Sequence, residues 1–267
     1  MRRTMLLSAL GALLLSSCGP EQAKDEGVKL VFSPEKGKEV KMTYEFTVIS
    51  TAKLDKTHFL MEMQGSAEKI DASQVVLVLE NQKITVDGSV EGKNISYDAN
   101  SPDSIPDEIK AVITPVFSLL NKKFKSVYDE RMNKLSESIV RSDSATRDSA
   151  ENKLQFFVRY PDTTIAEGYT WKRELVIKSG NKMNCSAIYT VKEIKEGQAV
   201  IAIEGDLTGE GETFGHVFSI TGTLKGTIRV DLRTGWPVDT DIQQDFTLDL
   251  NGNKIPMQYL IRHTVAI

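Results

Sequence analysis

Apolar and polar residues alternate along most of the chain. From Val40 to Val48 every second residue is apolar, while the residues between them are Lys, Thr or Glu. Such alternation is typical of a strand with one buried and one solvated face. The same pattern predicts further strands at about 57–69, 74–79, 83–90, 93–97, 124–129, 170–178, 182–194, 198–207, 216–231, 237–250 and 254–266. The sequence therefore predicts a mainly β protein (α+β) built on a curved antiparallel sheet or half-barrel.

The pattern changes between residues 105 and 121, where apolar side chains recur at helical spacing. Pro106, Asp107 and Glu108 form a helix start signal. Pro115 removes a backbone donor and bends or divides the segment, so the sequence predicts one broken helix at about 105–121. Because so apolar a helix needs an apolar surface, we expect it to pack on the concave face of the sheet. It would do so either permanently or as a lid over a lipid-sized cavity.

The first 27 residues predict where in the cell the protein is located. Arg2 and Arg3 precede an apolar run from Met5 to Leu15, which is the pattern of a secretory signal peptide, here 1–17. Leu15-Ser16-Ser17-Cys18 resembles the bacterial lipobox, in which the cysteine is acylated before the signal peptide is removed. We therefore expect Cys18 to anchor the mature chain in the membrane, with a flexible polar tether at 18–27. The expected location is the outer membrane of the cell envelope, on its periplasmic face or at the cell surface.

The remaining chain divides into two β-rich halves. Residues 28–136 contain the first strands and the helix, 137–155 form a polar helical connector, and 156–267 contain the second set of strands. The halves show a weak sequence similarity: a proline-to-glycine stretch precedes the strand at 40–49, and another precedes the strand at 171–177. The sequence allows two related halves, and we expect them to form one continuous domain.

The charge balance excludes one class of partner. The chain has 33 basic and 37 acidic residues, and removal of the signal peptide takes away Arg2 and Arg3, which changes the net charge from −4 to −6. An acidic chain offers no basic surface for nucleic acid. Cys185 alternates with apolar residues of a predicted strand, so we expect a small buried side chain rather than a reactive thiol.

No motif in the sequence predicts catalysis. His58, His216 and His263 are widely spaced and form no ligand pair for zinc. The sequence contains no Gly-x-Ser-x-Gly nucleophile motif and no phosphate-binding loop. Carboxylate pairs such as Asp239 and Asp241 share one strand face, which we expect to be solvated. We therefore expect a protein that is not an enzyme, with no catalytic residue, metal or cofactor.

Several short motifs occur in an order that carries a family resemblance. They are the lipobox, Lys36-Gly37-Lys38, Ile95-Ser96-Tyr97-Asp98, Pro161 to Trp171, Gly222 to Leu232, and Thr234-Gly235-Trp236. Over nearly the whole mature chain, this order resembles a family of uncharacterised Bacteroidota lipoproteins of unknown function. More remotely, the chain is similar to the LolA/LolB-like lipoprotein-carrier superfamily, whose curved half-barrels bind acyl chains. Tyr169 stands where the family usually has an acid, so no role is transferred to that position.

The resemblance implies a hydrophobic ligand. We expect the curved sheet and the helix to enclose a cavity that binds or carries a lipid or acyl group. The alternative is a structural or interaction module with a filled core that binds another envelope protein. The candidate lining residues are Met42, Tyr44, Phe46, Met61, Met63, Val112, Val116, Phe117 and Leu120.

Four positions fit an Asp-Ser/Thr-apolar pattern that resembles Bacteroidota O-glycosylation sites. They are Ser104, Ser144, Ser149 and Thr163. Asp-Ser pairs also act as caps and turns, so modification and local structure are both open interpretations.

Overall fold

The described part of the chain is built almost entirely of β-strands. The computed structural model describes residues 27–50, 55–69, 73–90, 92–101, 105, 114, 116–140, 156–178, 182–213 and 216–267. The strands are β1 (Glu39–Ser50), β2 (Asp55–Lys69), β3 (Gln74–Val90), β4 (Lys93–Asp98), β5 (Lys123–Asp129), β6 (Lys134–Val140), β7 (Thr170–Lys178), β8 (Lys182–Lys195), β9 (Gln198–Thr213), β10 (His216–Asp231), β11 (Pro237–Leu250) and β12 (Asn253–Ala266). The predicted mainly β, antiparallel architecture is confirmed.

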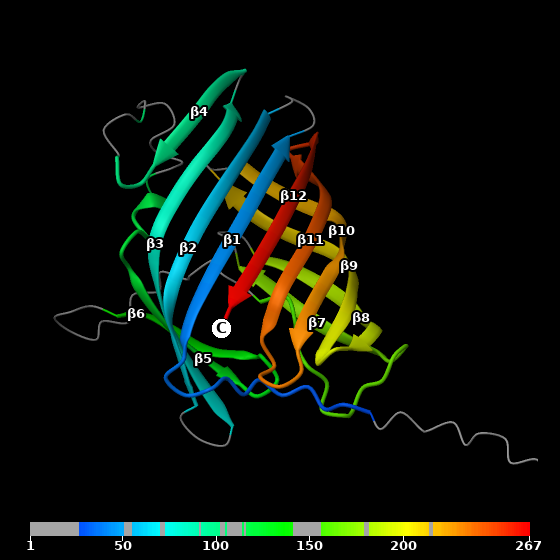
Figure 1. Cartoon of the computed structure of the whole chain (residues 1–267). Helices are drawn as coiled ribbons and strands as arrows, with labels where there is room; N and C mark the ends of the chain where they lie inside the picture. The colour runs from blue at the N-terminus through cyan, green and yellow to red at the C-terminus, as the bar shows by residue number, and fades with distance from the viewer. Residues whose placement is uncertain are drawn as a thin grey trace, which may run out of the picture.

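All the described strands belong to one open sheet. Its order is β6-β5-β3-β2-β1-β12-β11-β10-β9-β8-β7, and β4 pairs with β3 beside this path. The first and last strands therefore meet in the middle, where Lys41 pairs with Ala266 and Ser50 pairs with Met257. Figure 1 shows the sheet curled so that β7, β8 and β9 lie behind β1 and β12. This curvature agrees with the right-handed twist of strands and gives the sheet a concave face.

Glycines in β10 allow the neighbouring strand β11 to approach closely. Gly222 and Gly226 occupy positions on β10 that alternate with buried Leu224 and Ile228. A Cβ at either glycine would collide with a backbone carbonyl oxygen of β11, at Asp245 or Asp241. Glycine in a strand interior marks such a close approach.

A β-bulge explains why the sequence pattern divides β3 into two strands. Glu62 of β2 pairs with Lys83, whereas Met63 pairs with Asn81, so Gln82 is an extra residue in β3. A bulge shifts the alternation of buried side chains by one position. Leu79 is therefore buried on one side of the bulge and Ile84 on the other. The separate strands predicted at 74–79 and 83–90 are one strand.

The predicted boundary between the first half and the connector is wrong. Residues 137–140, expected to begin the polar helical connector, form the second part of β6. Within the described sheet β6 pairs only with β5, so it is an edge strand. Its apolar side chains Leu135 and Val140 are 51% and 44% exposed, which is why its sequence lacks the alternation of a half-buried strand. Residues 141–155 lie outside the described part.

Most of the predicted broken helix also lies outside the described residues. Helical structure is described at Thr114, Val116 and Phe117, and a turn continues to Asn121. Asn81 of β3 holds this turn, because its Nδ2 donates to the Leu119 carbonyl oxygen at 2.9 Å and its own carbonyl accepts from the Asn121 amide at 2.8 Å. The described helix is thus a short turn leading into β5, and the longer helix at about 105–121 stays a prediction.

Irregular segments close one end of the sheet, which we call the lower end because it lies at the bottom of Figure 1, where β1 begins and β12 ends. The Phe32 amide donates to the Glu130 carbonyl oxygen at 2.8 Å, and the Tyr160 amide donates to the Arg131 carbonyl oxygen at 3.0 Å. These bonds attach two irregular segments to the β5–β6 turn. Residues that are no more than 3% exposed gather there: Leu30, Phe32, Met132, Phe156, Tyr160 and Trp236.

Candidate functional site

The concave face brings together most of the residues predicted to line a ligand site. In the pairing of β1 with β2, Met42 lies opposite Met63 and Tyr44 lies opposite Met61. All four side chains are no more than 9% exposed, as is Phe117 from the helical turn. Phe46, Val116, Leu119 and Leu120 are partly buried against the same hydrophobic cluster. Val112 lies outside the described residues, as does Cys18.

Aromatic residues of the second half complete this wall at the opposite, upper end of the sheet. The Tyr259 ring of β12 contacts Phe46 at 4.8 Å and Phe246 of β11 at 4.7 Å, both edge to face, and Phe46 lies 6.1 Å from Phe59. We call these four residues the upper aromatic cluster. Three of them are only partly buried, whereas Phe246 is 7% exposed. Sequence reasoning missed Tyr259 and Phe246 because no local pattern shows that β12 lies beside β1.

A row of buried polar side chains crosses the concave face below this cluster. His263 of β12 lies opposite Tyr44 of β1 and opposite Thr240 of β11. The three side chains are 5%, 8% and 3% exposed respectively. His263 Nε2 is buried and has no hydrogen-bond partner in the described structure. Its ring lies 5.0 Å from that of Phe156.

Burial sets the protonation of this row. It lowers the pKa of His263 to about 3, so the imidazole is neutral at physiological pH. Burial also raises the pKa of the Tyr44 hydroxyl, which stays protonated. The row therefore offers uncharged donors and acceptors within a wall whose other buried side chains are mostly apolar, Gln244 of β11 being a further polar one.

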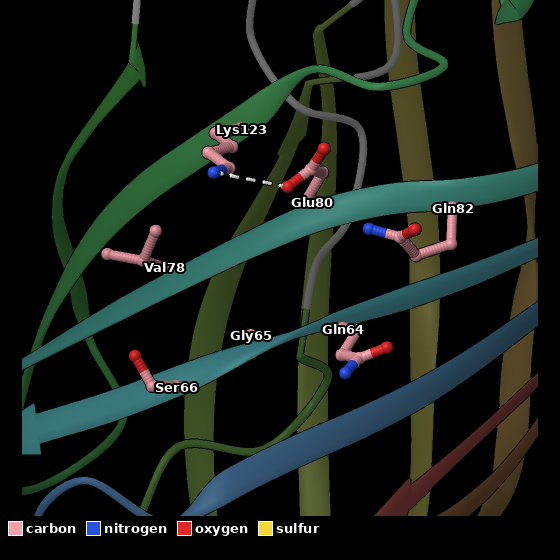
Figure 2. A pocket seen from close by; sticks show the side chains of 7 residues that line it. All are labelled: Gln64, Gly65, Ser66, Val78, Glu80, Gln82 and Lys123. Atoms are coloured by element: carbon pink, nitrogen blue, oxygen red, sulfur yellow. Dashed lines mark ion pairs between the residues drawn. The ribbon is translucent and has the colours of Figure 1, made fainter.

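A hollow of about 440 Å³ lies on the outer face of the sheet and is shown in Figure 2. Its floor is formed by β2, β3 and the start of β5, where Lys123 Nζ lies 3.3 Å from Glu80 Oε2. Gln64 Nε2 donates to Glu39 Oε1 at 2.6 Å beside it. Its lining residues are Gln64, Gly65, Ser66, Val78, Glu80, Gln82 and Lys123. The hollow is thus polar, and its charges neutralise each other.

The structure does not gather the histidines or present a reactive thiol. The His58 side chain is 34% exposed and its Nε2 lies 3.4 Å from Glu45 Oε2, whereas His263 is buried. The side chain of His216 lies outside the described part. Within the described residues, no group of three His, Cys, Asp or Glu side chains could hold a metal ion. Cys185 is fully buried, and burial raises the pKa of its thiol to about 11. Its thiolate, the reactive form, is therefore scarce at neutral pH.

One of the four suggested glycosylation positions is described. Thr163 is exposed, and its hydroxyl lies 2.8 Å from the Tyr169 hydroxyl. Ser104, Ser144 and Ser149 lie outside the described residues.

Comparison with known proteins gives a partial family match. Residues 113–237 match the model of a family of unknown function (DUF6263). No curated protein matches the chain. Among solved structures, the chain is similar to an outer membrane channel from Pseudomonas putida F1, with 8% identity, a TM-score of 0.23, and coverage of 91% of this chain and 98% of that one. Similarity at this level supports no argument about fold or function. No helix in the described ranges is both long enough and apolar enough to cross a membrane.

Proposed function

We propose that the protein is a lipid-anchored envelope protein whose concave face binds or carries a lipid or acyl ligand. The observation that carries the proposal is the difference between the two ends of the apolar wall. Trp236 and Phe32 at the lower end are 1% exposed, whereas Phe46, Phe59 and Tyr259 at the upper end are only partly buried. An apolar wall that is closed at one end and partly exposed at the other suits an elongated apolar ligand.

The side chains of this wall suit a ligand without fixed shape. Met42, Met61 and Met63 are unbranched and adapt to irregular surfaces. Val116, Phe117 and Leu120 pack against the same cluster from a short turn that Asn81 holds by hydrogen bonds. In this proposal, that turn and the predicted helix before it form the lid. Cys18, acylated as the lipobox predicts, holds the protein at the membrane from which the ligand is taken.

The test compares two identical substitutions at contrasting positions. Val116→Trp adds bulk beside the concave cluster, whereas Val217→Trp adds it at a side chain of β10 that is 66% exposed. The lipid-anchored protein and both variants are purified from host membranes and examined by native mass spectrometry with lipid extraction. We expect a noncovalent adduct of one acyl ligand on the unmodified protein and on Val217→Trp, and its loss on Val116→Trp. If the protein without substitutions carries no adduct and takes up none when offered phospholipid, the proposal is overturned.

A second candidate function is a filled module that binds another envelope protein. It is favoured by the tight packing of other side chains around Met42 and Met63, which leaves them 1% and 3% exposed. It is also favoured by exposed Leu135 and Val140 on edge strand β6, since an edge strand can pair with a partner's strand. This candidate predicts that native mass spectrometry shows the protein without any bound acyl ligand. It also predicts that Leu135→Lys weakens association with the partner without changing the fold.

A further inference from the structure

His263 is an uncommon residue to find on an apolar wall. It is 5% exposed, and its Nε2 has no hydrogen-bond partner in the described structure. Nearly all buried polar groups in proteins are hydrogen-bonded, because leaving one unpaired costs the full penalty of removing it from water. The nitrogen therefore marks a position on the concave face where a hydrogen-bonding group is missing.

The neighbours of His263 define what that missing group can be. Tyr44 and Thr240 lie on either side in register, so residues that carry hydroxyl groups flank His263 on both adjoining strands. No hydrogen bond or ion pair in the described chain brings a Lys or Arg side chain to His263. Arg159 of the lower end directs its Nη1 instead to the carbonyl oxygens of Phe156 and Val158, at 3.1 and 2.8 Å. A carboxylate or phosphate placed against this row would be a buried charge without a counterion.

An uncharged hydroxyl fits the row. A neutral imidazole nitrogen either donates or accepts a hydrogen bond according to its tautomer, and a hydroxyl can do both. The ring that now covers His263 is Phe156, whose centroid is 5.0 Å away. Phe156 belongs to an irregular segment rather than to a strand of the sheet, so its ring can move without breaking a strand pair.

We propose that His263, flanked by Tyr44 and Thr240, binds the uncharged hydroxyl head of an amphiphile whose hydrocarbon chain lies along the concave face toward the upper aromatic cluster. This inference rests on the proposed function and narrows its ligand to neutral amphiphiles such as fatty alcohols and acylglycerols. Phe156 occupies the head position until the ligand displaces it.

The experiment separates binding of any apolar molecule from selection of the head group. It uses the whole mature chain, residues 18–267, with Cys18→Ser so that no acyl chain is attached. N-phenyl-1-naphthylamine, a neutral fluorescent probe, reports occupation of the apolar face. Dodecanol and dodecanoate, which have equal chain length and differ in head-group charge, then compete with it at pH 7.5. We expect dodecanol to displace the probe at least about tenfold more effectively, because only dodecanoate buries a charge.

Two substitutions act on the head position in opposite directions. His263→Phe keeps a ring of similar shape and removes the nitrogen, so we expect dodecanol to bind about fivefold more weakly while probe binding is unchanged. Phe156→Ala vacates the head position and is expected to strengthen dodecanol binding. The matched control is His58→Phe, because His58 pairs with Glu45 on the other face and should alter neither ligand.

The outcomes distinguish the two proposals. A protein that does not bind the probe overturns the proposed function and, with it, this inference. A protein that binds the probe but is displaced equally by dodecanol and dodecanoate overturns the inference alone. An unchanged dodecanol affinity in His263→Phe, in a variant that still binds the probe, does the same.

Discussion

The two ends of the sheet both carry clustered aromatic rings, but the lower rings come from separate segments of the chain, whereas the upper rings come from adjacent strands of the sheet. At the lower end Phe32 lies 4.9 Å from Trp236 and 6.1 Å from Tyr128, and Tyr128 lies 5.6 Å from Phe156. These four residues belong to four separate segments. At the upper end Phe46, Tyr259 and Phe246 belong to the adjacent strands β1, β12 and β11. The lower rings therefore pack four separate segments against one another, whereas the upper rings pack only against neighbours within the sheet.

The two ends also differ in hydrogen bonding, because buried tyrosine hydroxyls hold the lower end in place. At the lower end the Tyr160 hydroxyl donates to the Gly235 carbonyl oxygen and the Tyr189 hydroxyl donates to the Phe157 carbonyl oxygen, both at 2.6 Å. Burial raises the pKa of both hydroxyls, so they remain donors. The Tyr160 and Tyr189 rings, which these hydrogen bonds hold, have few ways to rearrange, whereas the Phe156 ring, which makes only ring contacts, and the partly exposed upper cluster can move at lower cost. A ligand is therefore more easily accommodated at the upper end.

The largest expected effect comes from removing one ring at each end by the same substitution. Phe32 is 1% exposed, so Phe32→Ala should lower the free energy of unfolding by about 3–5 kcal/mol. Phe46 is partly buried, so Phe46→Ala should cost only about 1–2 kcal/mol. Urea denaturation of both variants measures the difference. Equal losses would show that the two ends contribute alike to stability and would remove the basis of the comparison.

The next effect concerns His263, which lies between the two ends beneath Phe156. The pKa of its imidazole is about 3 in the folded protein, below its ordinary value near 6.5, so the unfolded chain binds a proton that the folded chain does not. Stability is unaffected above about pH 7 and falls as pH drops toward 3, by about 3 kcal/mol between pH 6.5 and pH 4. Denaturation curves across this range should show a shallower loss for His263→Phe. Identical pH profiles would mean that His263 binds a proton as readily in the folded protein as in the unfolded chain, which would contradict the lowered pKa.

The strands could be predicted from sequence because each is dictated locally. Alternation from Val40 to Val48 lies inside β1, and the bulge at Gln82 interrupts the pattern at the residue where β3 changes register. The order of strands could not be predicted, because the pairing of β1 with β12 joins residues more than 200 positions apart in sequence. Edge strand β6 was missed because none of its side chains is buried, so neither face requires apolar residues and the sequence shows no alternation.

The part of the candidate site that comes from neighbouring strands could be predicted from the sequence, but the part that depends on strand order could not. Met42 and Met63 come from neighbouring strands of one half, and the structure places them opposite each other. The contribution of the second half was not predictable, since Tyr259 and His263 join the wall only through the pairing of β12 with β1. Nor does the sequence distinguish His263 from His58, although one is buried without a partner and the other lies beside a glutamate.

A pair of glycine substitutions, one at each end of the sheet, tests the same comparison through a smaller expected loss of stability. Gly235 has a φ of 69°, and a Cβ there would collide with the Val31 carbonyl oxygen, so Gly235→Ala should cost about 2–3 kcal/mol. Gly252, in the upper turn between β11 and β12, has a φ of 86° but no atom within 4 Å of an added Cβ, so Gly252→Ala should cost about 1 kcal/mol. Thermal unfolding of the two variants measures the contrast. A larger loss at Gly252 would mean that the upper end is the more constrained one.

The smallest effect sets the baseline against which both ends are judged. Lys123 pairs with Glu80 on the outer face, with side chains 54% and 28% exposed, and such pairs contribute only about 0–1 kcal/mol. Lys123→Met should therefore change the free energy of unfolding by less than about 1 kcal/mol. Lys225→Met is the matched control, because Lys225 lies opposite Glu204 in the other half of the sheet as Lys123 lies opposite Glu80. Denaturation in low and high salt tests the interpretation, since added salt should remove any difference between Lys123→Met and the unmodified protein. A loss above 2 kcal/mol at Lys123 alone would show that the outer hollow, and not only the lower end, holds the first half of the sheet together.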